Sequence, residues 1–140
     1  MAQKRPDRWL GPNHDTFWEW CGKGELRLQR CGDCGKLSWP VVKACEFCGS
    51  EKLQWERMSG RGKIVAWCTF ERDYYRGLLP VPWDTILVEL EEGPLFMSNP
   101  EGFTWQDITV GMDVELTFIE CEDSAGTYML PVCRLPVNAG

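Results

Sequence analysis

Two CxxCG units lie close together in the stretch RCGDCGKLSWPVVKACEFCGS. They contain Cys31 and Cys34 in the first unit and Cys45 and Cys48 in the second, with ten residues between Cys34 and Cys45. A CxxC loop brings two sulfurs to one tetrahedral ion, and the glycine after each unit tolerates the positive φ of such a tight turn. Four thiolates complete the coordination sphere, so no position stays open for water or substrate. The pattern predicts a structural metal site that contributes roughly 10 kcal/mol or more to folding.

Zinc is the metal that we expect at this site. Iron in a rubredoxin-like site is one alternative, because four thiolates in paired knuckles also suit iron. Two disulfides or free thiols are the alternatives without a metal. The flanking sequences LRLQR and KLQWER alternate as β-strands do. Residues 25–58 are therefore predicted to form a zinc ribbon.

Residues 1–24 are predicted to form an aromatic arm with one short helix. Thr16 and Glu19 fit a capping box at its start, and the glycines of CGKG end it. A helix of about two turns is not stable alone, so its apolar side chains must pack on something. Trp18 and Trp20 are candidates for contact with another subunit. The alternative is that they pack against this chain's own body.

Residues 59–140 are predicted to form a five-stranded barrel of the OB type. KIVAWCTF is its first strand, with Ile64, Ala66, Cys68 and Phe70 on one face. DTILVELEEGPLFMSNP reads as one hairpin and MDVELTFIECEDSAGTYMLPVCRL as another, with TWQDITVG as a short helical or turn connection between them. Five strands with this connection fit an OB-fold, although other five-stranded barrels are alternatives. The chain as a whole is predicted to be mainly β.

The chain of 140 residues has a net charge of −6, which is unevenly distributed. Residues 22–63 contain nine Lys and Arg against five Asp and Glu, whereas residues 64–140 contain three against thirteen. An acidic barrel repels polyphosphate, which argues against nucleic acid as a partner. The N-terminus has no apolar core of a secretory signal, and no run reaches the roughly 18 apolar residues of a membrane span. We therefore expect a cytoplasmic protein without membrane contact, whose thiols stay reduced.

No complete active site can be assembled from the sequence. Cys21, Cys68, Cys121 and Cys133 lie outside the CxxCG units and are expected to pack in the core as small apolar residues. His14 is the only histidine, and we expect it to be exposed, so no cysteine has an evident base. The sequence also lacks a GxSxG, P-loop or Rossmann fingerprint.

The order of these features resembles one known family. FWEW, then GELRLQRCGDCGKLSWPVVKACEFCGSEKLQWERMSGRGKIVAWCTF, and later PWDTILVELEEGPLFMSN and ITVGMDVELTF, are similar to zinc ribbon–OB-fold proteins once catalogued only as a domain of unknown function. The resemblance covers about residues 16–135. It implies that Cys31, Cys34, Cys45 and Cys48 bind a structural Zn²⁺.

The resemblance also implies a role in acyl-CoA metabolism. Members of this family work beside thiolase-superfamily enzymes or are fused to MaoC-like hydratases. A member is generally not the catalyst, but completes or steadies a CoA-binding channel in its partner. The segment PWDTILVELEEGPLFMSNPEG is most similar to members paired with steroid side-chain aldolases. A hetero-oligomer with a thiolase-like or aldolase subunit, with acyl-CoA at or near the interface, is thus expected.

CoA phosphates require positive charge on this acidic chain. The candidates are Arg61 and Lys63 at the ribbon–barrel junction and Arg72 and Arg76 in the loop ERDYYRGLLPVPW. That loop joins the first two barrel strands, where OB-folds commonly bind their ligands. Its apolar side chains are candidates for partner or substrate-channel contacts: Tyr74, Tyr75, Leu78, Leu79 and Trp83. Ordinary surface charge, and a loop folded back on its own barrel, are the respective alternatives.

Two other functions are compatible with parts of the sequence. Zinc ribbons and OB-folds both occur in proteins that bind single-stranded nucleic acid, in which aromatic rings stack on bases. A rubredoxin-like electron carrier would use the same four cysteines to hold iron.

Overall fold

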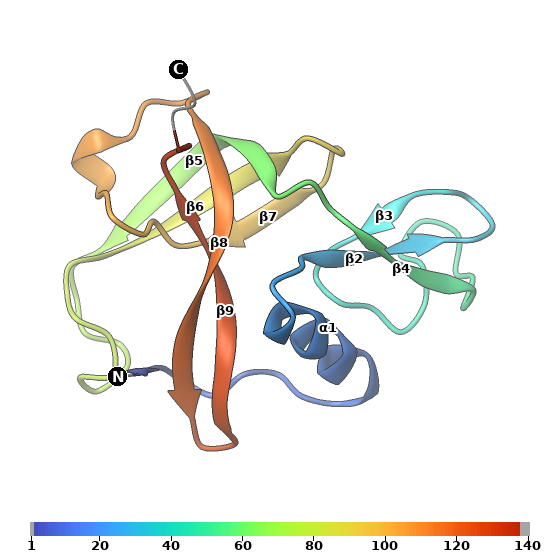
Figure 1. Ribbon diagram of the computed structural model, residues 1–140, viewed down its shortest axis with the longest axis horizontal. Helices are drawn as coiled ribbons and strands as arrows, with labels where there is room; N and C mark the ends of the chain where they lie inside the picture. The colour runs from blue at the N-terminus through green and yellow to red at the C-terminus, as the bar shows by residue number, and fades with distance from the viewer. Residues whose placement is uncertain (1, 138–140) are drawn as a thin grey trace.

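The computed structural model describes residues 2–137 of the chain. Met1 in the predicted arm and residues 138–140 in the predicted barrel segment lie outside the described residues. A β-barrel occupies one side of the molecule, a small three-stranded sheet occupies the other, and a helix lies beneath the space between them (Figure 1). The mainly β fold class predicted from the sequence is confirmed.

The N-terminal arm contains a strand as well as the helix. Strand β1 (Gln3–Lys4) pairs in parallel with β8 at Cys121 and Glu122. Helix α1 (Pro12–Gly22) begins after Gly11, with proline in its first turn. Since proline lacks an N–H and has a helical φ, it suits this position, and the helix begins one turn earlier than predicted.

The capping box predicted at Thr16 and Glu19 is wrong, because both residues lie inside the helix. The Thr16 hydroxyl donates to the carbonyl of Pro12 at 3.2 Å. Asp15 accepts a hydrogen bond from the backbone N–H of Gly11 at 3.1 Å, which satisfies one donor at the helix start.

The ribbon is an antiparallel sheet in the order β3–β2–β4. Strand β2 (Arg27–Cys31) lies in its centre, between β3 (Leu37–Ser38) and β4 (Leu53–Arg57). The buried side chain of Gln29 pairs with the backbone of Val42, accepting from its N–H at 2.8 Å and donating to its carbonyl at 2.9 Å. This pair fixes the loop between the two CxxCG units against the sheet.

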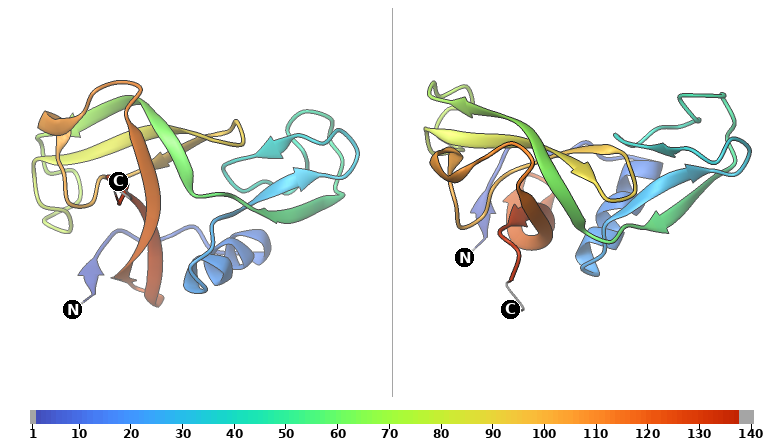
Figure 2. Two further views of the ribbon diagram at one scale, coloured as in Figure 1. Left: turned by 45° about the horizontal axis from the view of Figure 1, so that its top comes forward. Right: turned by 90° about the horizontal axis from the view of Figure 1, so that it is seen from above.

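The barrel is formed by five strands: β5 (Arg61–Phe70), β6 (Trp83–Leu90), β7 (Leu95–Ser98), β8 (Asp113–Asp123) and β9 (Gly126–Arg134). Strand β5 pairs with both β6 and β8, β7 pairs with β6, and β9 pairs with β8. A parallel bridge between Pro100 and Cys133 brings β9 to the end of β7 and closes the barrel. Both predicted hairpins are present, and the connection between them contains a 3-10 turn, η1 (Trp105–Asp107). Figure 2 shows the barrel and the ribbon side by side from two further directions.

A β-bulge at Val65 changes which side chains of β5 point inward. Ile64 pairs with Val88, but Ala66 already pairs with Leu87, so two residues of β5 oppose one of β6. Ile64 is therefore buried, while Ala66 and Cys68 are exposed. The prediction of one shared face for Ile64, Ala66, Cys68 and Phe70 is wrong for this reason.

The other three cysteines outside the CxxCG units are buried, as predicted, whereas Cys68 is exposed. Burial raises the pKa of Cys21 to about 12 and that of Cys133 to about 11. Both thiols therefore stay protonated near neutral pH, which makes them poor nucleophiles.

One core joins the three parts of the chain. It contains Phe17 from the helix, Leu28 from the ribbon, Met58 from the junction, and Val88 and Phe96 from the barrel. The ring of Trp39 in the ribbon loop lies 4.8 Å from that of Phe96. The helix and ribbon are thus packed against the barrel by side chains.

Candidate functional site

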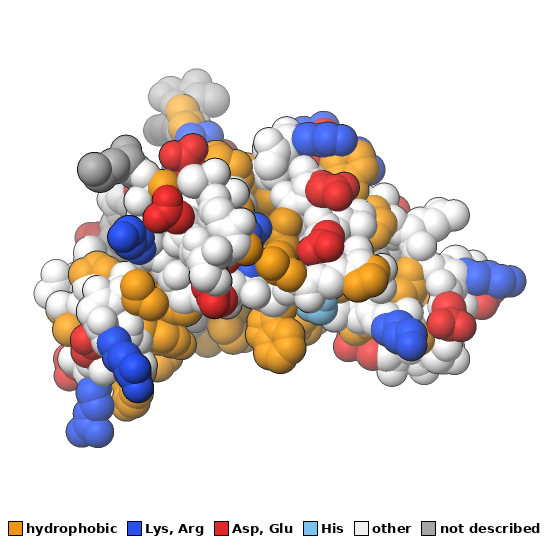
Figure 3. Space-filling model, turned by 90° about the horizontal axis from the view of Figure 1, so that it is seen from below, with side chains coloured by type: hydrophobic (Ala, Val, Ile, Leu, Met, Phe, Trp, Pro, Cys, Tyr) orange, Lys and Arg blue, Asp and Glu red, His pale blue; other side chains and the backbone are white. Residues whose placement is uncertain are grey.

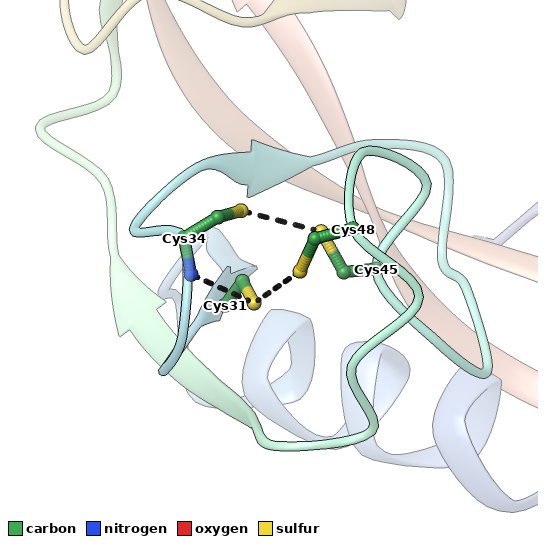
Figure 4. Close-up of side chains that lie close together, drawn as sticks. All are labelled: Cys31, Cys34, Cys45 and Cys48. Atoms are coloured by element: carbon green, nitrogen blue, oxygen red, sulfur yellow. Dashed lines mark hydrogen bonds between the residues drawn. The ribbon is translucent and has the colours of Figure 1, made fainter.

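The four cysteines of the CxxCG units point toward one another, one pair from the end of β2 and the turn after it and the other from the loop between β3 and β4 (Figure 4). Their sulfur atoms all lie within 4.8 Å of one another, and the pairs Cys31–Cys48 and Cys34–Cys45 are 3.5 Å apart. A tetrahedral ion with metal–sulfur bonds of about 2.3 Å needs sulfur–sulfur distances of about 3.8 Å. The arrangement therefore fits a single metal ion.

Backbone N–H groups surround these sulfurs. The N–H groups of Cys34 and Asp33 both lie 3.4 Å from the sulfur of Cys31, and they lower the pKa of Cys31 to about 6. The N–H of Phe47 makes the equivalent contact with Cys45 at 3.4 Å. These contacts favour the thiolate form of Cys31 and Cys45, which is the form that binds a metal.

Each CxxCG turn closes as its glycine requires. Gly35 has a φ of 76° and Gly49 a φ of 78°, and their N–H groups donate to the carbonyls of Cys31 and Cys45. The hydroxyl of Ser50 donates to Asp33 at 2.6 Å and so ties the two turns together. The site is therefore held by the turns themselves, whose positive φ values only glycine adopts at low cost.

The loop between β5 and β6 divides into a packed half and an exposed half. Leu79 is buried, and the ring of Trp83 stacks on that of Phe70 at 4.6 Å. Tyr74 and Leu78, in contrast, are 63% and 41% exposed. The loop thus folds back on the barrel in part and presents apolar side chains in part.

The two tryptophans of the helix pack against this chain. Trp18 meets the ring of Tyr128 edge-on at 5.1 Å, and its indole N–H donates to the carbonyl of Trp9. Trp20 lies beneath the guanidinium of Arg27, which is 3.8 Å from its ring centre. Both rings are consequently used in the intramolecular packing of the arm.

The four basic residues predicted for CoA phosphates do not converge. Arg61 and Lys63 lie at the start of β5 and pair with Glu91 at 2.8 Å and Asp113 at 2.7 Å. Arg72 and Arg76 follow the other end of the same strand, and both are exposed. Within residues 2–137, neither of these two arginines makes an ion pair.

An apolar groove of about 660 Å³ lies between the N-terminal arm, the ribbon loop and the barrel. Four residues predicted from the sequence as partner or substrate-channel candidates line it: Trp18, Tyr75, Leu79 and Trp83. Trp20, Tyr74 and Leu78 are not among its lining residues. His14, which is partly buried and not exposed as predicted, also lines the groove, and Figure 3 shows hydrophobic side chains gathered beside it.

Two family models match the chain. Residues 18–54 match the rubredoxin-like zinc ribbon domain of ChsH2, and residues 55–118 match the C-terminal OB-fold domain of ChsH2. The chain belongs to the ChsH2 family. The resemblance to zinc ribbon–OB-fold proteins is thereby confirmed, as is the prediction of a ribbon followed by an OB-fold.

Two curated proteins are similar to this ChsH2-family chain. A DUF35 domain-containing scaffold protein of Pyrococcus furiosus is 32% identical over 92 residues, which are 61% of this chain and 64% of the relative. The 3-oxo-4,17-pregnadiene-20-carboxyl-CoA hydratase alpha subunit of Mycobacterium tuberculosis is 33% identical over 122 residues, which are 84% of this chain and 39% of the relative. The chain thus spans less than two thirds of the length of these relatives.

Among solved structures, one chain of the Ltp2-ChsH2(DUF35) aldolase superposes on this ChsH2-family chain with a TM-score of 0.79. The two sequences are 27% identical, and the match covers 92% of this chain and 98% of that one.

The helices of residues 2–137 include none that is long and apolar enough to cross a membrane.

Sequence reasoning missed the residues that the first ten positions bring to the groove. Arg5, Arg8 and Trp9 line it. They reach it because β1 pairs with β8, and the guanidinium of Arg8 forms an ion pair of 2.7 Å with Asp123. The only sequence signal was the basic and aromatic composition of KRPDRW, since two paired residues are too few for a periodic pattern.

Proposed function

We propose that this chain is a non-catalytic subunit that binds a thiolase-superfamily enzyme and helps to form or stabilise its acyl-CoA channel. The observation that carries the proposal is the superposition on a chain of the Ltp2-ChsH2(DUF35) aldolase over nearly the whole length of both. The relative from Mycobacterium tuberculosis, which is named for a pregnadiene carboxyl-CoA, supports a bulky acyl-CoA as the partner's substrate. A thiolase or an aldolase acting on steroid side chains is the partner that we favour.

The exposed half of the β5–β6 loop is the proposed contact with the partner. Tyr74, Leu78 and Val81 are 63%, 41% and 42% exposed in a single loop. Adjacent exposed apolar side chains are characteristic of protein interaction sites. Arg72 precedes these residues and Arg76 lies between Tyr74 and Leu78. Neither arginine makes an ion pair among residues 2–137, so these two are the CoA-phosphate candidates that we retain.

The metal that we propose for the four cysteines is one structural Zn²⁺ per chain. Four thiolates at these distances leave no open position, which suits zinc as a folding element. Elemental analysis of the purified protein should find zinc, and its solution should be colourless. A visible absorption band together with one iron per chain would instead support the rubredoxin-like carrier.

Co-purification tests the proposed function. We would express the chain with a candidate thiolase-superfamily enzyme from the same organism and purify the complex through a tag on one subunit. Both proteins should elute together, and acyl-CoA turnover should require the partner. Turnover of an acyl thioester by the chain alone, or the absence of any complex, would refute the proposal.

The loop can be tested with a matched pair of variants. Leu78→Asp places a charge in the exposed loop and should weaken the complex by roughly 10- to 100-fold, because a buried interface does not tolerate an unpaired charge. Val110→Asp is the control, since Val110 is 59% exposed and precedes Gly111, which bonds to Ile64 far from the loop. Equal weakening by both substitutions would argue against the loop as the contact.

A further inference from the structure

Two of the segments that form the apolar groove are held in place by side-chain contacts. The N-terminal segment is anchored by the Arg8–Asp123 ion pair, in which Asp123 also accepts from the backbone N–H of Arg8 at 3.1 Å. The ribbon loop that supplies Trp39 is anchored by the Gln29–Val42 pair, and Asn13 of the helix donates to the same carbonyl of Val42 at 3.0 Å. The groove is therefore pre-formed by segments distant in sequence, as small-molecule sites usually are.

Aromatic and aliphatic side chains supply most of the groove surface. Phe96, Met97 and Leu130 line it. Four of the tryptophans also line it: Trp9, Trp18, Trp39 and Trp83. Its volume of about 660 Å³ falls within the range of roughly 300–1,000 Å³ that is usual for ligand pockets. Such walls favour a hydrocarbon body over a polar one.

One positive charge lines this groove without an acidic partner. Arg8 is neutralised by Asp123, but Arg5 makes no ion pair within residues 2–137. Among residues 2–137, the guanidinium of Arg5 donates only to the side-chain oxygen of Asn99, at 3.4 Å, and Asn99 also lines the groove. A partly buried guanidinium with most of its donors free is suited to a carboxylate or a phosphate.

We propose that the groove binds an amphipathic small molecule, with its hydrocarbon body among the tryptophans and its anionic end at Arg5. The anionic group is the carboxylate of a free fatty or steroid acid. The inference concerns this chain alone and does not depend on which enzyme it accompanies. This site also differs from the one expected from the sequence, in which the basic residues predicted to bind CoA phosphates lie on β5 and in the loop after it.

The test uses the tryptophans as reporters. Terminally brominated dodecanoate, its methyl ester, dodecanoyl-CoA and CoA would be titrated into the intact protein, because bromine quenches indole fluorescence on contact. Brominated dodecanoate should quench saturably, whereas dodecanoyl-CoA, which has a thioester in place of the carboxylate, should displace it only weakly. CoA alone should not displace it. No saturable quenching, or displacement by CoA alone, would overturn the proposal.

Two neighbouring residues of β7 provide the matched variants. Met97 lines the groove and is 55% exposed, whereas Leu95 on the same face is 47% exposed and does not line it. Met97→Arg should weaken binding of the brominated acid by at least about 10-fold, and Leu95→Arg should leave it unchanged. Trp9→Ala is a second groove variant that should also weaken binding of the brominated acid. Because Trp9 is 81% exposed, this substitution should not disturb folding. Equal effects of the two arginine substitutions would indicate nonspecific surface binding.

Arg5→Gln separates the charge from the apolar contact. It should weaken binding of brominated dodecanoate by about 10-fold, the usual contribution of a charge-assisted hydrogen bond, and change binding of the methyl ester less than about 2-fold. If Met97→Arg blocked co-purification with the partner but left quenching intact, the groove would be a protein-docking site and the ligand proposal would fail. Failure of co-purification in the unaltered protein would instead concern only the proposed function.

Discussion

At the scale of single residues, the Arg8–Asp123 pair is the strongest electrostatic contact of the N-terminal arm. The side chain of Asp123 is 1% exposed, and hydrogen bonding to Arg8 lowers its pKa from 3.8 to about 2. A lowered pKa stabilises the folded state above about pH 4, and this contribution disappears as the pH falls toward 2. Asp123→Asn should therefore reduce the free energy of unfolding by about 2 kcal/mol at pH 7 and by much less at pH 2. Urea unfolding at several pH values measures the difference.

Asp113 supplies the control for this prediction. Its ion pair with Lys63 has the same length of 2.7 Å, but the two side chains are 68% and 59% exposed. Solvent screens such pairs, so Asp113→Asn should change the free energy of unfolding by less than about 0.5 kcal/mol at any of these pH values. A loss at Asp123 that did not depend on pH would contradict the role of its charge.

At the scale of elements, strand β5 depends on a single glycine where it crosses its two neighbours. Gly62 pairs with Leu90 of β6 and Val114 of β8. A Cβ atom there would lie 2.6 Å from both the carbonyl oxygen of Glu89 and a methyl group of Val88. Gly62→Ala should therefore destabilise the protein by more than about 2 kcal/mol. Gly22→Ala, with no atom within 4 Å of the added methyl, should be neutral or stabilising in the same thermal unfolding experiment.

The elements that the sequence predicts well are those whose determinants are local. The CxxCG turns need only their own cysteines and glycines, and the two hairpins need only alternating strands around EEGP and EDSAG. The β-bulge at Val65 has no such local signature, and it reversed the prediction for Cys68. Strand β1 is also unpredictable from pattern, because its partner Cys121 lies more than one hundred residues away in the chain.

The parts of the candidate site also differ in whether their determinants are local in the sequence. The cluster of four cysteines that could hold a metal could be predicted from spacing, because one loop supplies each pair of thiols. The groove could not be predicted from spacing, since its walls come from the N-terminal arm, the ribbon loop and three strands of the barrel. Of the lining residues, only Tyr75 and Leu79 of the β5–β6 loop, Trp83 at the start of β6 and Trp18 of the helix were predicted from the sequence as contact candidates. Their convergence depends on tertiary packing.

At the scale of the whole molecule, the shared core should couple the metal to the barrel. Phe17 and Leu28 are buried against barrel residues such as Phe96, and Met58 donates its backbone N–H to the carbonyl of Leu26 at the junction. If the ribbon loses its metal and unfolds, that apolar surface of the barrel becomes exposed to water. Metal loss should then destabilise every part of the chain, including strands far from the cysteines.

Cys45→Ser tests this coupling, because it removes a buried thiol that is one of the four proposed metal ligands. The variant should lose its metal and unfold at a temperature lower by more than about 10 °C, since structural zinc contributes many kcal/mol and each one shifts the midpoint by about 2–4 °C. Amide hydrogen exchange should accelerate in β8 and β9 as well as in the ribbon. Cys68→Ser, at an exposed cysteine outside the cluster, should change neither the metal content nor the midpoint. Were the amides of β8 and β9 to keep full protection after metal loss, the barrel would be an independent folding unit, and the core contacts of Phe17 and Leu28 would contribute little to it.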